Sequence, residues 1–219
     1  MKYKVVPLYS YSELSDEAKE QVKQWYIDDP LRSEDLTDQF KESFVRYFFP
    51  NSRLNVEWSL NSCQGDGVNI CGELRLFDVL DYIERWNPDE HGEGYTYCPL
   101  GEFTPKEISR LRHYIGYDHQ NVHAVSLPSN RHYSYCVAGL MDEFVEDMID
   151  DLKYWGWRDI DKELVNRFQH VVIKIISGLC KEMERYGYSF LYDVSNEEVA
   201  VACESNEWTF TADGKFEVA

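Results

Sequence analysis

Residues 54–76 read LNVEWSLNSCQGDGVNICGELRL. Apolar and polar residues alternate on both sides of Gly65-Asp66-Gly67, and this alternation is typical of β-strands that bury one face. Glycine tolerates positive φ and aspartate favours tight turns, so the three central residues are typical of a hairpin connection. We therefore predict an antiparallel hairpin with strands at about 53–61 and 67–76.

Helical signals flank this hairpin on both sides. Ser15 precedes two acidic residues, which is typical of a helix N-terminus, and Pro30 is expected to end that helix. Thr104-Pro105-Lys106-Glu107 is a capping box with proline at the first helical position, and it predicts a further helix start. The other predicted elements are helices at 34–48, 77–86, 139–154, 160–186 and 195–204, strands at 3–9, 120–127, 131–138 and 188–193, and a turn at Asp213-Gly214.

The segment 160–186 is the predicted central core helix, because its apolar residues recur at helical spacing. Together with the antiparallel hairpins, it predicts an α+β fold. The length suits one domain over residues 1–219, with a subdivision near the glycine-containing loop 87–103 as the alternative. The apolar residues of the core helix are Leu164, Phe168, Val171, Val172, Ile175, Ile176 and Leu179.

The composition is that of a folded protein without a membrane span. Of the 219 residues, 43% are hydrophobic and 15% aromatic, more than a disordered chain carries. No apolar run approaches the ~18 residues of a membrane-spanning helix, and the start, MKYKVVPLYSY, is too short and too polar for a signal peptide. We expect a cytoplasmic protein with no membrane association. Without a Cys-x-x-Cys pattern, the cysteines are expected to be free thiols: Cys63, Cys71, Cys98, Cys136, Cys180 and Cys203.

Charge disfavours one class of partner and favours another. Asp and Glu number 40 against 22 Lys and Arg, which gives a formal net charge of −18. A phosphate backbone repels so acidic a body, so we expect no direct contact with nucleic acid. A basic protein suits it as a partner. The alternative is that the charge only keeps the protein soluble and apart from its neighbours.

Three motifs resemble those of one protein family. Leu14-Ser15-Asp16-Glu17-Ala18-Lys19 is similar to an L-S-x-E-A-K helix, and Ser62-Cys63-Gln64-Gly65-Asp66-Gly67 to an S-Q-G-D-G turn with one residue inserted. Phe210-Thr211-Ala212-Asp213-Gly214-Lys215 is similar to an F-T-x-D-G-K ending. The family comprises small acidic proteins common in phage and prophage genomes, some of them labelled antitoxins. The resemblance covers residues 1–75 and 195–219, and it implies an origin in a mobile element.

The sharpest feature is the predicted helical segment MDEFVEDMIDDL, residues 141–152. At helical spacing its acids form two parallel rows beside an apolar face. Acids four residues apart repel by roughly 0.2–0.5 kcal/mol per pair, and no basic residue intervenes before Lys153. The apolar face has Met141, Phe144, Val145, Met148, Ile149 and Leu152, and the rows have Asp142, Glu146 and Asp150, and Glu143, Asp147 and Asp151.

These rows have two interpretations. One is a solvated face on a packed helix. The other is a ladder of carboxylates about 6 Å apart, from a rise of about 1.5 Å per residue. Such a ladder imitates a nucleic-acid backbone and fits a basic groove built for DNA or RNA. On this hypothesis, acids of the second helix extend the field: Glu34, Asp35, Asp38 and Glu42.

The hairpin loop and a group of histidines are weaker candidates. The loop is expected to be only a turn. The alternative is a contact loop of Gln64, Gly65, Asp66 and Gly67, where a partner approaches the backbone and meets a carboxylate. His119 and His123 are four apart within a histidine group spanning His113 to His132, but the segment is predicted as a strand, so no metal site is expected.

Three functional hypotheses follow, and no cofactor is expected for any of them. The first is a non-enzymatic phage or mobile-element protein that inhibits a host nucleic-acid-targeting defence complex, of the CRISPR or restriction type, by nucleic-acid mimicry. The second is an antitoxin-like protein that neutralises a basic toxin. The third is an enzyme that uses the Gly65-Asp66-Gly67 loop. It ranks last because nucleophile, phosphate-loop and dinucleotide motifs are absent from the sequence.

Overall fold

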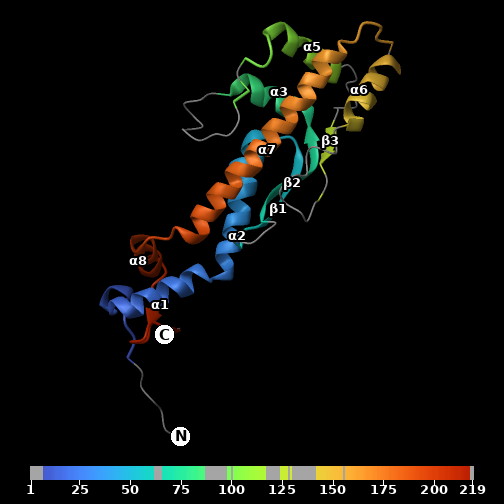
Figure 1. The fold of residues 1–219 in the computed structure, drawn as a ribbon. Helices are drawn as coiled ribbons and strands as arrows, with labels where there is room; N and C mark the ends of the chain where they lie inside the picture. Colours follow the sequence, from blue (N-terminus) through green and yellow to red (C-terminus); the bar gives the residue numbers. More distant parts are fainter. Residues whose placement is uncertain are drawn as a thin grey trace. The chain divides into compact units, whose positions relative to one another are not determined.

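The computed structural model describes residues 7–61, 66–86, 98–99, 101–116, 124–127, 129, 142–154 and 156–217, without the side chains of 142–144. The fold is α+β, as predicted (Figure 1). Contacts divide the chain into unit 1, Met1–Leu36 with Tyr186–Ala219, and unit 2, Thr37–Arg185. The single domain over 1–219 remains a prediction, and most of the segment 87–103 lies outside the described residues. Across the part that is described, no helix has the length and hydrophobicity that crossing a lipid bilayer requires.

Unit 1 joins segments from both ends of the chain. From the N-terminal side come the 3-10 helix η1 (Tyr11–Glu13) and helix α1 (Asp16–Ile27). From the C-terminal side come helix α8 (Asn196–Ser205) and the antiparallel pair β4 (Thr209–Phe210) and β5 (Phe216–Glu217). Their apolar side chains form one core: Tyr11, Leu14, Ala18, Val22, Val194, Val199, Cys203 and Phe210.

Two helices of unit 1 start at the predicted capping residues. The Ser15 hydroxyl accepts a hydrogen bond from the Ala18 backbone N–H at 3.3 Å, and the Ser195 hydroxyl accepts one from the Glu198 N–H at 3.1 Å. Each bond satisfies a donor that a helix N-terminus leaves open. Both predicted starts are confirmed.

The predicted Asp213-Gly214 turn is confirmed and packs against α1. Gly214 has a φ of 80°, a conformation that side chains with a Cβ rarely adopt. A Cβ at this position would lie 2.4 Å from the carbonyl oxygen of Ala18. Glycine therefore allows the close approach that joins the C-terminal turn to the first helix.

The predicted strand 188–193 is wrong, because helix α7 (Lys162–Tyr192) continues through it. Aromatic rings four residues apart stack along this part of the helix, Tyr186 on Phe190 and Tyr188 on Tyr192. The alternation of aromatic and other residues imitates a strand, whereas the stacking is helical.

The predicted strand 3–9 is described only over residues 7–9. Within them, Tyr9 forms an isolated antiparallel bridge with Phe210. The Tyr9 N–H donates to the Phe210 carbonyl oxygen at 2.8 Å, and the Phe210 N–H donates back at 3.0 Å. The N-terminal segment therefore pairs with β4 at one residue of the described part.

Unit 2 contains the predicted hairpin. Strands β1 (Arg53–Ser59) and β2 (Gly67–Arg75) pair antiparallel, with Val56 opposite Ile70. Strand β3 (Ala124–Leu127) pairs with the other edge of β2, so the sheet has the order β1-β2-β3. A strand at 120–127 was expected to pair with 131–138, and that second segment lies outside the described residues.

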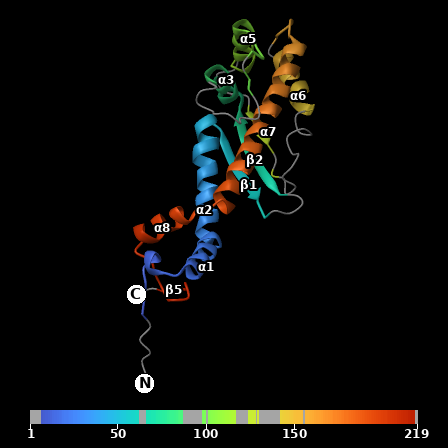
Figure 2. The same cartoon turned by 60° about the vertical axis from the view of Figure 1, so that its left-hand side comes forward.

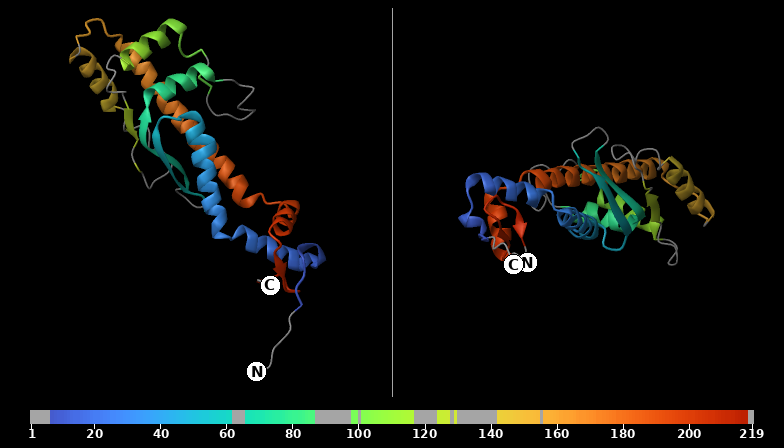
Figure 3. Two further views of the ribbon diagram at one scale, coloured as in Figure 1. Left: turned by 180° about the vertical axis from the view of Figure 1, so that it is seen from behind. Right: turned by 90° about the horizontal axis from the view of Figure 1, so that it is seen from below.

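Several helices lie next to this sheet. Figures 1, 2 and 3 show α3 (Leu76–Arg85) and α5 (Pro105–Ile115) together at one end, α6 (Asp142–Tyr154) beyond β3, and α7 alongside the strands. Helix α5 starts at the predicted capping box. The predicted core residues of α7 are all buried, at 2% exposure or less, so its central role in the core is confirmed: Leu164, Phe168, Val171, Val172, Ile175, Ile176 and Leu179.

The helix predicted at 34–48 starts earlier and changes type. Helix α2 (Pro30–Gln39) is followed directly by the π-helix η2 (Phe40–Arg46). The first residue of α2 is the proline that the sequence predicts as the end of the preceding helix, since proline is also favoured at a helix start. In π geometry, residues five apart share a face, and Phe40 and Val45 are both buried.

Candidate functional site

Helix α6 buries its apolar residues, as predicted. Val145, Met148, Ile149 and Leu152 have at most 7% exposure. Met141 and the side chain of Phe144 lie outside the described part. The burial fixes the rotation of the helix about its axis, so the positions between the buried residues face solvent.

Four carboxylates of the acidic rows lie on the exposed face of α6. They fall in two rows with a repeat of four residues, so neighbours in a row are about 6 Å apart along the axis. Asp142 and Glu143 belong to the first turn of α6, and nothing is described of their side chains. The four exposed carboxylates are Glu146, Asp147, Asp150 and Asp151.

Internal pairing neutralises only part of this face. Lys153 Nζ lies 2.6 Å from Asp150 Oδ1, and its hydrogen bond lowers the pKa of the Asp150 carboxyl. The Lys153 and Asp150 side chains are 54% and 73% exposed, so water screens the pair and an outside cation can replace the lysine. Glu146 and Asp147 form no ion pair with any residue that the structure describes.

The acids of the second helix do not join this face within unit 2. Asp38 and Glu42 are exposed, and Glu42 pairs with Arg46. Their helix contacts β1, whereas α6 lies beyond β3 at the other edge of the sheet (Figure 1). Glu34 and Asp35 are exposed residues of unit 1. Within unit 2, the acids of the second helix and those of α6 therefore form two separate groups.

Asp66 has a structural role in the hairpin turn. Its carboxylate accepts hydrogen bonds from the Asn61 backbone N–H at 2.7 Å and from the Ser59 hydroxyl at 3.1 Å. Both bonds close the turn, as the prediction of a structural loop requires. Gly67 is buried, and Gln64 and Gly65 lie outside the described residues, so a contact role for the loop stays a hypothesis.

Of the histidine group, the structure describes one residue, His113. The His113 ring packs edge-on against the Trp157 ring, with centroids 4.9 Å apart. His119, His123 and His132 lie outside the described residues, so the expectation of no metal site is untested there. Where the structure is described, no cluster of three metal-binding side chains occurs. Cys71, Cys98 and Cys203 are free thiols, as expected.

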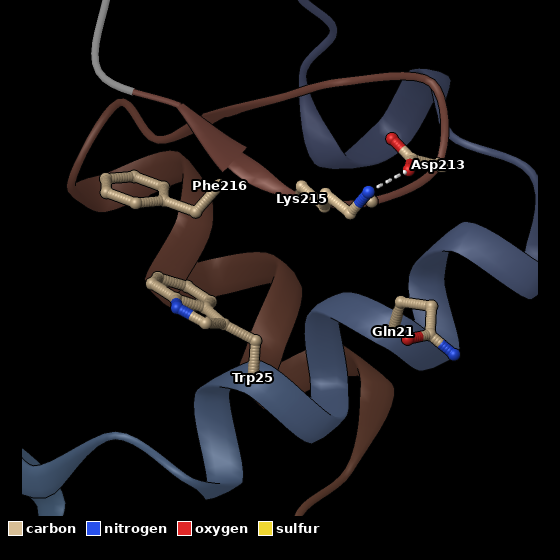
Figure 4. Close-up of a pocket in the computed structure, with 6 residues that line it drawn as sticks. Gln21, Trp25, Asp213, Lys215 and Phe216 are labelled. Carbon is tan, nitrogen blue, oxygen red and sulfur yellow. Dashed lines mark ion pairs between the residues drawn. The ribbon is translucent and has the colours of Figure 1, made fainter.

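Unit 1 holds a pocket of about 540 Å³ between α1 and the turn that joins β4 to β5 (Figure 4). Sequence patterns did not single it out, because its walls come from opposite ends of the chain. The glycine of the F-T-x-D-G-K motif was the available signal, since it marks a close approach of backbone segments. The lining residues are Gln21, Trp25, Asp213, Gly214, Lys215 and Phe216.

Comparisons of this chain with protein-family models, with curated proteins and with solved structures find no match.

Proposed function

We propose that this protein is a non-enzymatic product of a phage or other mobile element that binds a basic partner protein through α6. The partner, on this proposal, is a nucleic-acid-targeting defence complex of the bacterial host, of the CRISPR or restriction type. Its basic groove would accept the acidic face in place of DNA or RNA, in the cytoplasm. The observation that supports the proposal best is the exposure of four carboxylates in two rows on one well-packed helix.

The physical argument is electrostatic. A net charge of −18 attracts a basic groove at long range and raises the rate of encounter. Close contact then depends on carboxylates whose positions are set in advance. Because the inner face of α6 is buried, the helix backbone keeps its outer carboxylates at a fixed spacing, and binding orders only their exposed side chains.

The test is a charge reversal on α6 with a matched control. The variant Glu146→Lys, Asp147→Lys and Asp150→Lys reverses three of the four exposed carboxylates without touching a buried residue. The control carries Glu20→Lys, Asp193→Lys and Glu204→Lys, which reverse three exposed acids of unit 1. Both variants change the net charge equally, so a difference between them reports on the position of the charges.

Purified CRISPR and restriction complexes would be titrated with each protein, and displacement of bound DNA or RNA measured at low and high salt. We expect the wild type and the control to displace nucleic acid, more strongly at low salt, and the α6 variant to lose about 100-fold in affinity. Equal activity of the control and the α6 variant would refute a role for this face. Displacement insensitive to salt would contradict nucleic-acid mimicry.

The antitoxin hypothesis makes the same use of α6 with a different partner. Capture of a small basic toxin from lysate by the wild type and not by the α6 variant, together with no effect on the defence complexes, would favour it. For the enzyme hypothesis, the hydrogen bonds of Asp66 support a role in closing the turn.

A further inference from the structure

The pocket of unit 1 has an aromatic side and a polar side. Figure 4 shows Trp25 and Phe216 close together on one side, and Asp213, Lys215 and Gln21 toward the other. Its volume of about 540 Å³ lies within the range of ligand-binding clefts. The chemistry of these two sides decides what the pocket can hold.

The aromatic side is rigidly built. The Trp25 and Phe216 rings stack with centroids 4.8 Å apart and planes 16° apart. Trp208 and Phe210 pack edge-on against the same indole, with centroids at 5.1 and 5.9 Å. Rings held in this way keep their orientation. Each of the two stacked rings covers one face of the other, so they offer a ligand in the pocket a rigid aromatic wall, against which a planar cation can rest.

The polar side contains an ion pair that exchanges easily. Lys215 Nζ lies 2.8 Å from Asp213 Oδ2, and the two side chains are 78% and 61% exposed. The hydrogen bonds from Lys215 and Thr211 lower the pKa of Asp213 to about 2, so the carboxylate is ionised at neutral pH. Exposed pairs of this kind contribute little stability, so another cation can displace the lysine.

A guanidinium suits these surroundings better than an ammonium. Its planar fork forms two parallel hydrogen bonds to one carboxylate and also stacks on aromatic rings. The same unit already contains such an arrangement. The Arg32 guanidinium lies 4.4 Å from the Tyr26 ring and 4.7 Å from the Phe190 ring, and its Nη1 donates to Glu198 at 3.3 Å.

We propose that this pocket binds an arginine side chain presented by a basic partner protein. The guanidinium takes the place of Lys215 on the Asp213 carboxylate and rests against Trp25 and Phe216. The Gln21 amide oxygen, on the α1 wall, accepts a further N–H. The net charge of −18 favours this cation over an anionic ligand such as a phosphate.

This proposal rests on the proposed function in one respect only, namely that the partner protein is basic. It adds a second contact, in unit 1, that differs from the carboxylate rows of α6. Its test uses a small probe, so it does not depend on the identity of the partner. Failure of the α6 charge reversal to affect displacement leaves the probe result unaffected, and the two ideas therefore fail separately.

The probe is Nα-acetyl-arginine amide, titrated into the whole 219-residue chain while the assigned indole N–H signal of Trp25 is followed by NMR. Nα-acetyl-norleucine amide is the neutral control, and inorganic phosphate is the anionic control. We expect saturable shifts with the arginine probe alone. Asp213→Asn, which keeps an oxygen acceptor for the turn, should weaken binding about tenfold or more.

Two further variants leave Asp213 in place. Lys215→Met removes the internal competitor, so binding of the arginine probe should become about twofold to fivefold tighter. Gln21→Glu adds a second carboxylate, on the α1 wall of the pocket, and should also tighten binding of the arginine probe. The circular dichroism spectrum of each variant checks its fold.

Several results would overturn the proposal. They are the absence of saturable shifts in the wild type, equal shifts with the norleucine probe, and loss of arginine binding in Lys215→Met. Phosphate binding that Lys215→Met abolishes would show that the pocket is an anion site instead.

Discussion

Arg32 shows how a single residue ties the helices of unit 1 together. Its side chain is 6% exposed and lies between two aromatic rings, with Nη2 donating to the Phe190 carbonyl oxygen. We predict that Arg32→Ala lowers the free energy of unfolding by about 2–4 kcal/mol, because packing and hydrogen bonds are lost together. Urea denaturation followed by tryptophan fluorescence measures this change.

Its ionic partner provides the matched comparison. Glu198 is 46% exposed, so water screens its attraction to the guanidinium. Glu198→Gln should therefore cost about 1 kcal/mol or less. If Glu198→Gln costs as much as Arg32→Ala, then ion pairing and not ring packing holds the arginine, and our account of this residue is wrong.

At the scale of one element, the Glu107 carboxylate at the start of α5 takes up a proton only in strong acid. The Glu107 carboxylate accepts a hydrogen bond from the Thr104 backbone N–H at 2.7 Å and another from its hydroxyl at 2.8 Å. These bonds, with a further one from Arg167, lower the pKa of Glu107 from 4.5 to about 2. The charged form therefore stabilises the folded protein above about pH 4.5, and this contribution disappears as the pH falls through 2.

We predict that Glu107→Gln flattens the dependence of the unfolding free energy on pH between 4.5 and 2. Fewer protons are then taken up on unfolding in this range. Urea titrations at several pH values give the slope. Thr104→Val removes the hydroxyl donor and should flatten the slope in the same direction, whereas unchanged slopes in both variants would contradict the assignment.

Elements with local signals were predictable from the sequence. Three helices start at residues whose side chains accept a hydrogen bond from a backbone N–H three residues later, so no distant contact is needed to predict them. These residues are Ser15, Thr104 and Ser195. The Gly65-Asp66-Gly67 hairpin has the same local character. The continuation of α7 beyond Tyr186 was missed because every second residue there is aromatic, a pattern typical of a strand, whereas the rings stack at the helical spacing of four.

The two candidate sites, the acidic face of α6 and the pocket of unit 1, also differ in whether a local sequence pattern predicts them. The exposure of Glu146 and Asp150 follows from helical periodicity once the apolar face of α6 is buried, so a single segment predicts it. The pocket requires Gln21 and Lys215 to meet, and these residues belong to opposite ends of the chain. Nothing in either segment alone indicates the other.

At the scale of the whole molecule, the excess of acidic residues opposes folding. A charge of −18 repels itself in the compact state, and dissolved ions screen this repulsion. We predict that raising sodium chloride from low to physiological concentration raises the Tm. Differential scanning calorimetry measures it, and the triple lysine variant of α6 should respond less. A Tm that stays constant or falls with salt would contradict the prediction.

The construction of unit 1 from both ends of the chain has a consequence for its biosynthesis. Helix α1 leaves the ribosome early, but α8 and the β4–β5 turn, which complete its core, are translated only after all of unit 2. The apolar face of α1 is therefore not covered by these segments while the intervening part of the chain is synthesised and begins to fold. A nascent chain stalled before Gly214 would still lack the turn that packs against Ala18, and that region would be open to proteases and chaperones.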